Sequence, residues 1–231
     1  MTPTPSAEQL EPLRHLDGCL LANAIETFHQ RLRSEGFMDA SIHCLFPELP
    51  PMLGYAATIT IRGSAPPTAS GTYPDRTDWW DYIVALPSPR VVVIQDVATN
   101  PGLGGLVGAV HMNILRALGC VGVVTNGAAR DIPAAESAGF RYFVGGVSVS
   151  HAYIHIIEFG KPVEIGGLKV RSGDLLHGDL HGVQSIPLNL ATRIPAVAAE
   201  IVAKEQKLIA LCQSPEFSLE MLRAAIANAR F

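Results

Sequence analysis

The sequence lacks the features that mark several specialised classes of protein. Its four cysteines are scattered and no two form a CxxC pair, which disfavours a structural zinc site and is typical of a reducing compartment. No stretch of about 18 apolar residues occurs, so we expect neither a membrane-spanning helix nor a membrane partner. The net charge is −4 and lysine and arginine never form a run, which disfavours nucleic acid as a partner.

The N-terminus does not resemble a signal peptide, because MTPTPSAEQLEPL has no basic segment followed by an apolar one. What the chain does have is 48% hydrophobic and 16% charged residues among its 231 positions, which is enough for a sizeable core. We therefore expect a globular, cytoplasmic α/β protein. Residues 1–7 should be frayed, because they are rich in proline, threonine and serine.

Three regions have helical character. From Asp17 onward apolar residues recur at three- and four-residue steps, so a helix should begin with Asp17 as N-cap and stop at Gly36. A second helix should have Thr77 or Asp78 as N-cap. The expected helices cover residues 17–33, 77–86 and 191–230, the last with a break at Pro215.

The middle of the chain predicts a parallel sheet. Nearly continuous β-branched runs flank a helical segment at residues 108–120, which is the pattern of a βαβ unit whose strands are buried on both faces. Between residues 147 and 187, short alternating segments separated by glycine turns predict antiparallel strands instead. The two strands of the βαβ unit are residues 90–96 and 121–127. Further strands are expected at 54–63 and 140–146, with a short helix at Pro133–Ser137.

Glycines crowd the loop between the first strand of the βαβ unit and its helix, in 102-GLGGLVG-108. At such a place backbone N–H groups can approach an anion at the positive end of the helix dipole. A small carboxylate or phosphate would fit, and so would a dinucleotide pyrophosphate, although the spacing is one residue off the usual fingerprint. A tight turn with close packing would need the same glycines, so the loop alone does not decide.

Arg130 and Asp131 follow the second strand of the unit, at the carboxyl end where open α/β sheets bind ligands. They should therefore share one crevice with the glycine-rich loop. The planar fork of arginine suits a carboxylate, and an aspartate oxygen is a hard ligand suited to Mg²⁺ or Mn²⁺. The pair predicts a site for an anionic small molecule held on a divalent ion. The alternative is a helix-capping aspartate beside a surface arginine.

The run 108-GAVHMNILRALGCVGVVTNGAARD-131 resembles the RraA-like family, which includes regulators of ribonuclease activity and divalent-metal 4-hydroxy-4-methyl-2-oxoglutarate aldolases. The resemblance implies a swivelling β/β/α fold, with three layers, a mostly parallel central sheet and helices, assembled as a homotrimer or hexamer. It extends over about residues 15–212. The remaining chain would be a flexible N-terminal segment at residues 1–14 and a C-terminal helical extension at 213–231.

The resemblance also implies a mechanism. Asp131 would bind Mg²⁺ or Mn²⁺, partly through water, and Arg130 would hold the oxygen of a small anionic 2-oxo acid and stabilise its enolate. Retro-aldol cleavage would then release pyruvate, with decarboxylation of oxaloacetate as a side reaction. The substrate carboxylate would be bound by the backbone amides of Gly108, Ala109, Val110 and His111.

One position departs from the family pattern. An acidic residue is expected twenty-one positions before Arg130, where this chain has Ala109. Loss of a proton-transferring carboxylate normally lowers a rate by about 10²–10⁴-fold. The chemistry is then weakened, or another group such as His111 replaces the acid, or the protein binds without turnover. A helix-surface or interface position is the plainer interpretation of His111.

Two further groups of side chains have open interpretations. His151 and His155 should share one face of a strand. With His177 and His181 they would form a zinc site. The alternative is that all four are packed or interface residues. Trp79 and Trp80 would form a lid over the crevice, or else pack into the core or a subunit contact.

Three functions compete at this point. The first is a metal-dependent lyase acting on a small 2-oxo acid. The second is a non-catalytic oligomeric protein that regulates a ribonuclease by protein contact, which Ala109 favours. The third is a nicotinamide-dependent dehydrogenase, which the off-register glycine spacing disfavours.

Overall fold

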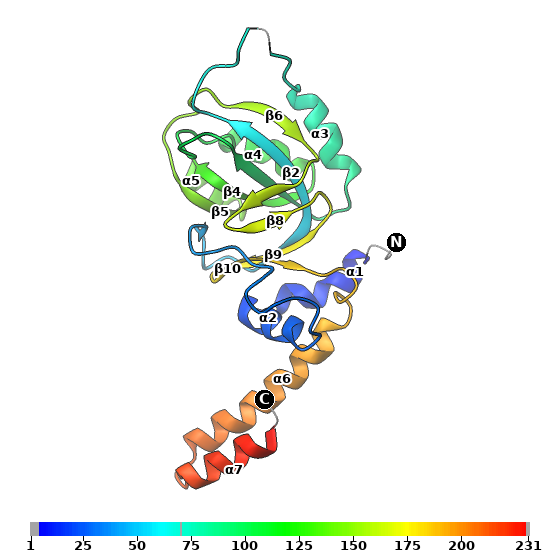
Figure 1. The fold of residues 1–231 in the computed structure, drawn as a ribbon, viewed down its shortest axis with the longest axis vertical. Coiled ribbons are helices and arrows are strands. Elements are labelled where there is room, and N and C mark those ends of the chain that lie inside the picture. The colour runs from blue at the N-terminus through cyan, green and yellow to red at the C-terminus, as the bar shows by residue number, and fades with distance from the viewer. Residues whose placement is uncertain (1–4, 70, 230–231) are drawn as a thin grey trace.

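Four parallel strands form the centre of the protein (Figure 1). The structure is a computed structural model that describes residues 5–69 and 71–229. The strands are buried on both faces, β2 among them. The βαβ prediction is confirmed. The strand order is β5 (Arg141–Val147), β4 (Cys120–Ala129), β3 (Arg90–Asp96) and β2 (Met52–Arg62).

Antiparallel strands extend this centre into an eight-stranded sheet. One strand pairs with β5. Two others pair with β2, and a fourth pairs with one of these two. A hairpin forms a separate two-stranded sheet. The antiparallel region predicted beyond residue 147 is confirmed from His155 onward, but residues 148–154 form a loop. The strands are β1 (His43–Cys44), β6 (His155–Phe159), β7 (Val163–Ile165), β8 (Leu168–Val170), β9 (Leu175–Asp179) and β10 (Gly182–Ile186).

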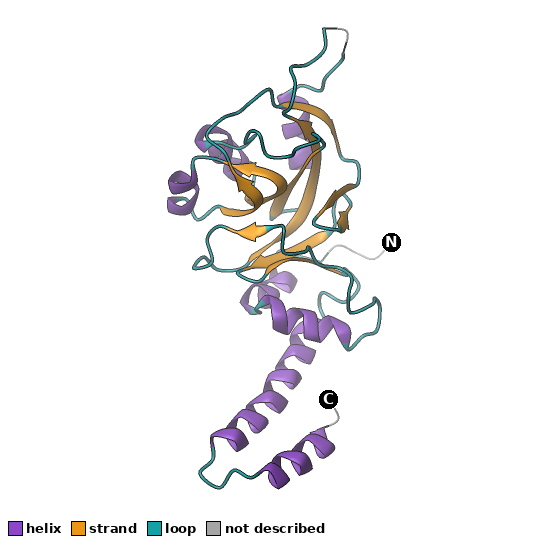
Figure 2. Ribbon diagram, turned by 60° about the vertical axis from the view of Figure 1, so that its left-hand side comes forward, coloured by secondary structure: helices purple, strands orange, loops and turns teal. Residues whose placement is uncertain are grey.

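Two layers cover the central strands, as Figure 2 shows. Three helices pack on one face, where Trp79, Leu115 and Phe140 belong to one apolar cluster. The β7–β8 hairpin packs on the other face with Val163 and Val170. This arrangement confirms the predicted three-layer α/β fold. The helices of the first face are α3 (Arg76–Ala85), α4 (Ala109–Ala117) and α5 (Ile132–Ser137).

Helices occupy the place where the sequence predicted a flexible segment. Ser6 and Gln9 form a capping box at the start of the first helix, and Leu10 and Leu13 are 1% and 0% exposed. Both leucines join a third apolar cluster against the end of the sheet. Residues 1–4 lie outside the described part of the chain. The helices are α1 (Ala7–Leu10), the 3₁₀ helix η1 (Glu11–His15) and α2 (Gly18–Glu26).

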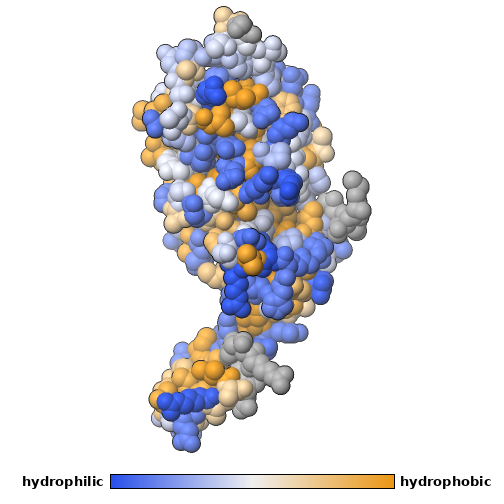
Figure 3. Space-filling model, viewed as in Figure 1, coloured by the Kyte–Doolittle hydropathy of each residue, from blue (hydrophilic) through white to orange (hydrophobic). Residues whose placement is uncertain are grey.

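The C-terminal helices α6 (Ile194–Gln213) and α7 (Leu219–Ala229) form an arm that leaves the body (Figure 1). The break predicted at Pro215 is confirmed. Only the start of α6 is anchored, since Ile194 and Ala198 are buried whereas Val202 and Ile209 are exposed. Figure 3 shows apolar surface on this arm. Across the described ranges, no helix combines the length and apolar character needed to cross a membrane.

Two predicted helix boundaries needed correction. The N-cap Asp17 is right, because its carboxylate accepts the N–H of Leu20 at 2.9 Å. However, α2 ends at Glu26 and the helix does not continue to residue 33, because His29 adopts a left-handed φ of 52° that interrupts helical geometry.

The second correction concerns the start of α3. Its N-cap is Asp75, whose carboxylate accepts the N–H of Thr77 at 2.7 Å. Thr77 and Asp78 were the predicted caps, but both lie inside the helix. Three of the four positions 75–78 offer good capping side chains, and local pattern does not distinguish among them.

Candidate active site

The glycine-rich loop is fixed where it leaves β3. The buried carboxylate of Asp96 accepts the N–H groups of Ala98 and Gly102, both at 3.0 Å. The side chain of Asn126 in β4 accepts the N–H of Asp96 at 2.8 Å and donates to its carbonyl oxygen at 3.0 Å. Sequence reasoning missed both residues. The signal available was an aspartate that closes a buried strand directly before a glycine-rich loop.

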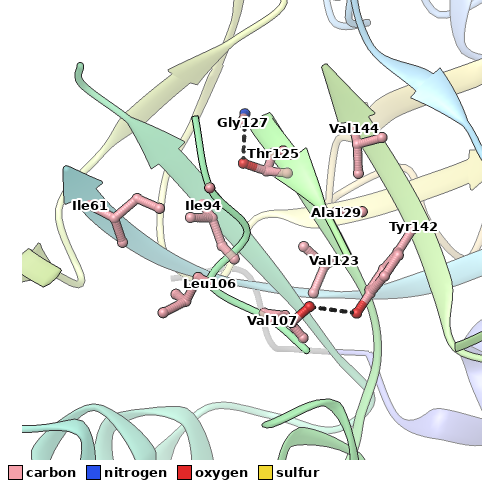
Figure 4. A pocket seen from close by; sticks show the side chains of 12 residues that line it. Ile61, Ile94, Leu106, Val107, Val123, Thr125, Gly127, Ala129, Tyr142 and Val144 are labelled. Carbon is pink, nitrogen blue, oxygen red and sulfur yellow. Dashed lines mark hydrogen bonds between the residues drawn. The ribbon is translucent and has the colours of Figure 1, made fainter. Parts of the chain in front are cut away.

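A small cavity beneath the loop is structural. It measures about 10 Å³, about the space of one water molecule, and Figure 4 shows its apolar lining. At its edge the Tyr142 hydroxyl donates to the Val107 carbonyl at 3.1 Å, which holds the loop one residue before Gly108. Burial raises the pKa of Tyr142, so its hydroxyl stays protonated as this bond requires.

Asp131 bonds to a helix other than its own. It stands at the N-cap position of α5 in a left-handed conformation, with a φ of 54°, and makes no side-chain bond to that helix. Its Oδ2 accepts the N–H of Ala109, the first residue of α4, at 2.7 Å. The alternative of a capping aspartate beside a surface arginine therefore holds for the aspartate, which caps α4 and not α5, but not for Arg130, whose side chain is only 18% exposed. The predicted convergence of the loop and the Arg130–Asp131 pair is confirmed.

Gly108 allows this close approach. A Cβ atom at residue 108 would lie 2.7 Å from Asp131 Oδ2 and 3.3 Å from Arg130 Nε, and one at Gly105 would lie 3.0 Å from Arg130 Cγ. A Cβ at Gly104 would overlap the backbone of His151. These three glycines therefore serve close packing, and their spacing gives no support to a dinucleotide.

Arg130 has unused hydrogen-bonding capacity. Its side chain is 18% exposed, and Nη2 lies 3.7 Å from Asp131 Oδ1. Nε and Nη1 are buried without a hydrogen-bond partner among the described residues. Buried donors of this kind are normally completed by water or a ligand, and a guanidinium prefers an anionic oxygen. Arg130 is therefore arranged to receive such a group.

A hollow of about 360 Å³ opens beside this pair. Its floor is the first turn of α4, where the N–H groups of a helix have no intrahelical partner and the dipole is positive. All the predicted site residues line this hollow. Val110 points mainly outward, with 78% exposure. The lining consists of Arg76, Trp80, Leu106, Gly108, Ala109, Val110, His111, Ile114, Arg130, Asp131 and His151.

His111 is buried and fully engaged. The indole N–H of Trp80 lies 3.4 Å from Nε2, and Nδ1 lies 3.4 Å from the Leu106 carbonyl. Together these partners require a neutral ring protonated on Nδ1. Burial lowers the pKa of His111, in agreement with that state. The predicted surface or interface position is wrong, and neither nitrogen is free to replace a missing acid.

The two tryptophans divide between core and site. Trp79 is fully buried, and its ring meets that of His111 edge to face with centroids 5.3 Å apart. Trp80 is partly buried and lines the hollow. The lid interpretation is therefore wrong for Trp79, and Trp80 forms a wall.

The four histidines predicted as a possible zinc site are separated. His151 lines the hollow and lies in a loop, so it does not share a strand face with His155. His177 is buried with Nε2 3.0 Å from the Leu16 carbonyl, and His181 contacts Asp179 at 3.2 Å. Within the described residues, no group of three histidine, cysteine or acidic side chains could hold a metal.

The residues of the hollow do fit one kind of metal site. Asp131 supplies the carboxylate among the lining residues, and its Oδ1 has only the 3.7 Å contact to Arg130. Mg²⁺ is commonly held by one or two carboxylates, with water and substrate oxygens completing the shell. The hollow therefore fits Mg²⁺ or Mn²⁺ shared with a substrate, and does not fit a metal enclosed by protein ligands alone.

Comparison with known proteins identifies the family. The model of the RraA-like family, described as Aldolase/RraA, matches residues 21–184. The chain belongs to the RraA-like family. A Halalkalibacterium halodurans protein with the provisional name 4-hydroxy-4-methyl-2-oxoglutarate aldolase is 33% identical over 101 residues. That alignment covers 43% of this chain and 48% of the relative, so it spans about half of that protein's length.

Solved structures support the RraA fold. An uncharacterized protein from Pseudomonas syringae pv. tomato superposes with a TM-score of 0.74 at 23% identity, over 97% of this chain and 96% of that one. Streptomyces coelicolor RraAS2, described as an unusual member of the RNase ES inhibitor RraA protein family, gives a TM-score of 0.69 at 20% identity. This second match covers 88% of our RraA-like chain and 96% of RraAS2.

Proposed function

We propose that this RraA-like protein is a divalent-metal-dependent lyase acting on a small 2-oxo acid. The observation that carries the proposal is the pair of buried, unpartnered donors on Arg130 beside the Asp131 carboxylate. A 2-oxo acid offers a planar array of carboxylate and carbonyl oxygens that matches a guanidinium fork. The proposed substrate is 4-hydroxy-4-methyl-2-oxoglutarate or a close analogue.

In the proposed cleavage, the C3–C4 bond breaks and its electron pair forms the enolate of pyruvate. The C4 hydroxyl loses its proton and becomes the carbonyl of a second pyruvate, while C3 takes up a proton. Arg130 would donate to the developing enolate oxygen, and the free amides at the start of α4 would bind the substrate carboxylate. Bound Mg²⁺, held by Asp131, would act as an electron sink. Decarboxylation of oxaloacetate would yield the same enolate and CO₂.

Ala109 stands at the position where the family pattern has an acidic residue. Its N–H bonds to Asp131, and Asp131 is the carboxylate of the lining. Proton transfer then falls to His151, which is exposed and lines the hollow, whereas His111 is fully engaged. We therefore place His151 as the proton-transferring residue of a weakened lyase.

A non-catalytic regulatory oligomer is the second candidate function, and Ala109 favours it. A further hollow of about 460 Å³ adjoins Arg130 and Asp131. Its rim carries Val147 and Val149, which are 64% and 99% exposed. Exposed apolar side chains at a polar site suit a contact with another subunit, as a homotrimer or hexamer would provide.

Exchange of the pyruvate methyl protons with solvent deuterium tests the lyase proposal. Mg²⁺-dependent exchange above a protein-free blank is the expected result, because the site should stabilise the pyruvate enolate. Absence of exchange at high protein concentration would reject the lyase. The substitution Ala109→Glu restores the family's acid and should raise the exchange rate by about 10²-fold. If only Ala109→Glu is active and the native protein is inert, the regulatory alternative is favoured.

A further inference from the structure

The hollow contains a second arginine that the proposed chemistry leaves unused. Arg76 is exposed and lines the hollow together with Arg130. It makes no ion pair within 4.0 Å among the described residues. The lining therefore combines two arginines and one carboxylate, Asp131. Asp131 lies beside Arg130, so Arg76 has no carboxylate partner among the lining residues.

The fold places the two arginines on different walls. Arg76 and Trp80 are four residues apart on α3, so they share a face of that helix. Trp80 reaches the far end of the first turn of α4, through its bond to His111. Arg130 lies at the near end of that turn, since a Cβ at Gly108 would be 3.3 Å from its Nε. A ligand that lies across the start of α4 would thus have an arginine at each end.

Helix stability does not account for Arg76. It is the first residue of α3, directly after the N-cap Asp75. A cation in the first turn opposes the helix macrodipole, which favours acidic residues there. Asp75 Oδ1 accepts both the N–H and the hydroxyl of Thr77 at 2.7 Å. These hydrogen bonds, and to a smaller extent the charge of Arg76, lower the pKa of Asp75, but Arg76 forms no ion pair with it within 4.0 Å. An arginine at this position is better explained by what it faces than by the helix it begins.

We propose that Arg76 is a specificity-determining residue that binds the second anionic group of the substrate. The inference rests on the proposed function, because it assumes that Arg130 binds the 2-oxo carboxylate end. The proposed substrate is already a 2-oxo dicarboxylate, and what the inference adds is the residue, Arg76, that binds its second carboxylate and so favours it over a 2-oxo monocarboxylate of the same chain length. Trp80 would line the side of the bound chain between the two charged ends.

A matched pair of unreactive ligands tests this inference by binding alone. 2-Oxoglutarate and 2-oxopentanoate have the same five-carbon chain and differ in the second carboxylate. Their affinities are measured by isothermal titration with Mg²⁺ present, for the native protein, Arg76→Gln, Arg76→Lys and the control Arg171→Gln. Arg171 is exposed, lies in a turn beside β8, and does not line the hollow.

The native protein should bind 2-oxoglutarate at least about tenfold more tightly than 2-oxopentanoate. Arg76→Gln should remove that preference while changing 2-oxopentanoate affinity less than about twofold, and Arg76→Lys should retain part of it. Arg171→Gln should match the native protein. An absence of preference in the native protein, or an equal loss for both ligands in Arg76→Gln, overturns the inference.

Failure of this inference is distinguishable from failure of the lyase. Proton exchange into pyruvate needs one carboxylate, so exchange by the native protein and by the control Arg171→Gln tests the lyase proposal independently of Arg76. A protein that discriminates the two ligands but exchanges no protons keeps the Arg76 inference and loses the lyase. A protein that exchanges protons but does not discriminate the two ligands keeps the lyase proposal and loses the Arg76 inference. In an active protein, Arg76→Gln should raise KM for the dicarboxylate about tenfold or more with kcat nearly unchanged.

Discussion

Two aspartates, Asp131 and Asp179, bond to the N-termini of helices that they do not themselves begin, and they differ in what else surrounds them. Asp131 accepts the N–H of Ala109 at the start of α4, and Asp179 accepts the N–H of Gly18 at the start of α2 at 2.6 Å. A glycine makes room in each case, since a Cβ at Gly18 would lie 2.8 Å from Asp179 Oδ1. Both sites thus combine a remote aspartate with a glycine at the helix N-terminus, which is the donor itself in α2 and the residue before the donor in α4.

The difference is in the remaining hydrogen bonds. Asp179 is 7% exposed and also accepts the N–H of His181 at 2.9 Å and contacts its Nδ1 at 3.2 Å. Asp131 has 38% of its side chain exposed and stands beside Arg130, two of whose nitrogens lack partners. A satisfied aspartate joins two parts of the fold, whereas an unsatisfied Arg–Asp pair next to a hollow is suited to a ligand.

The largest contrast should appear when each aspartate becomes asparagine. Asp131→Asn should lower Mg²⁺-dependent pyruvate proton exchange by about 10³-fold, because a neutral amide is a poor ligand for the ion. Asp179→Asn, its matched control, should leave exchange per folded molecule unchanged. Exchange is followed by NMR in deuterium oxide. Equal losses in the two variants would contradict the functional distinction between the aspartates.

The histidines near the two sites should differ in the same way. His151→Asn should lower the exchange rate by about 10²-fold, because the hollow loses the imidazole to which the proposal assigns proton transfer. His181→Asn changes the histidine that contacts Asp179 and should leave the rate unaltered. A rate profile from pH 5 to 9 checks both. An unchanged profile for His151→Asn would reject its role in proton transfer.

Stability should show the reverse order of effects. Asp179→Asn should lower the free energy of unfolding by about 1–3 kcal/mol, because buried N–H groups of Gly18 and His181 lose a charged acceptor. Asp131→Asn should lower it by less than about 1 kcal/mol, since the amide oxygen can still accept from Ala109. Urea denaturation at pH 7 measures both values. A larger loss for Asp131→Asn would contradict the comparison.

The smallest expected effect is on the stability of the protein at low pH. Burial alone would raise the pKa of Asp179, but hydrogen bonds from Gly18 and His181 outweigh it and the pKa lies below its ordinary value. Such a carboxylate stabilises the folded state fully above its unfolded pKa, about 3.9, and the contribution is lost as pH falls through the folded pKa. The stability difference between native protein and Asp179→Asn should therefore shrink below about pH 4. A constant difference down to pH 2 would contradict this assignment.

Much of the fold could be predicted because its signals are local. The β-branched runs of β3 and β4 and the helix between them identified a parallel βαβ unit, and that topology placed Arg130 beside the glycine-rich loop. The capping box of Ser6 and Gln9 was also local and readable, but the polar composition around it led to the expectation of a flexible segment.

What sequence could not supply were bonds between distant residues. Gly18 and Asp179 are 161 positions apart, and Ala109 and Asp131 are 22 apart on separate elements. No periodicity or spacing distinguishes the aspartate with several protein partners, Asp179, from the one beside an arginine with unpartnered donors, Asp131. His111 shows the same limit, because its burial depends on Trp80 from another helix.

The central claim is that the unpartnered donors of Arg130 bind an anionic ligand oxygen. Oxalate is a planar analogue of the pyruvate enolate, so its binding can be followed through the Arg130 Nε–H resonance in a ¹⁵N NMR spectrum. We predict that saturating oxalate with Mg²⁺ shifts this resonance and protects it from solvent exchange, and that Arg130→Lys identifies it by its absence. An unshifted resonance at saturating oxalate and Mg²⁺ would contradict the account.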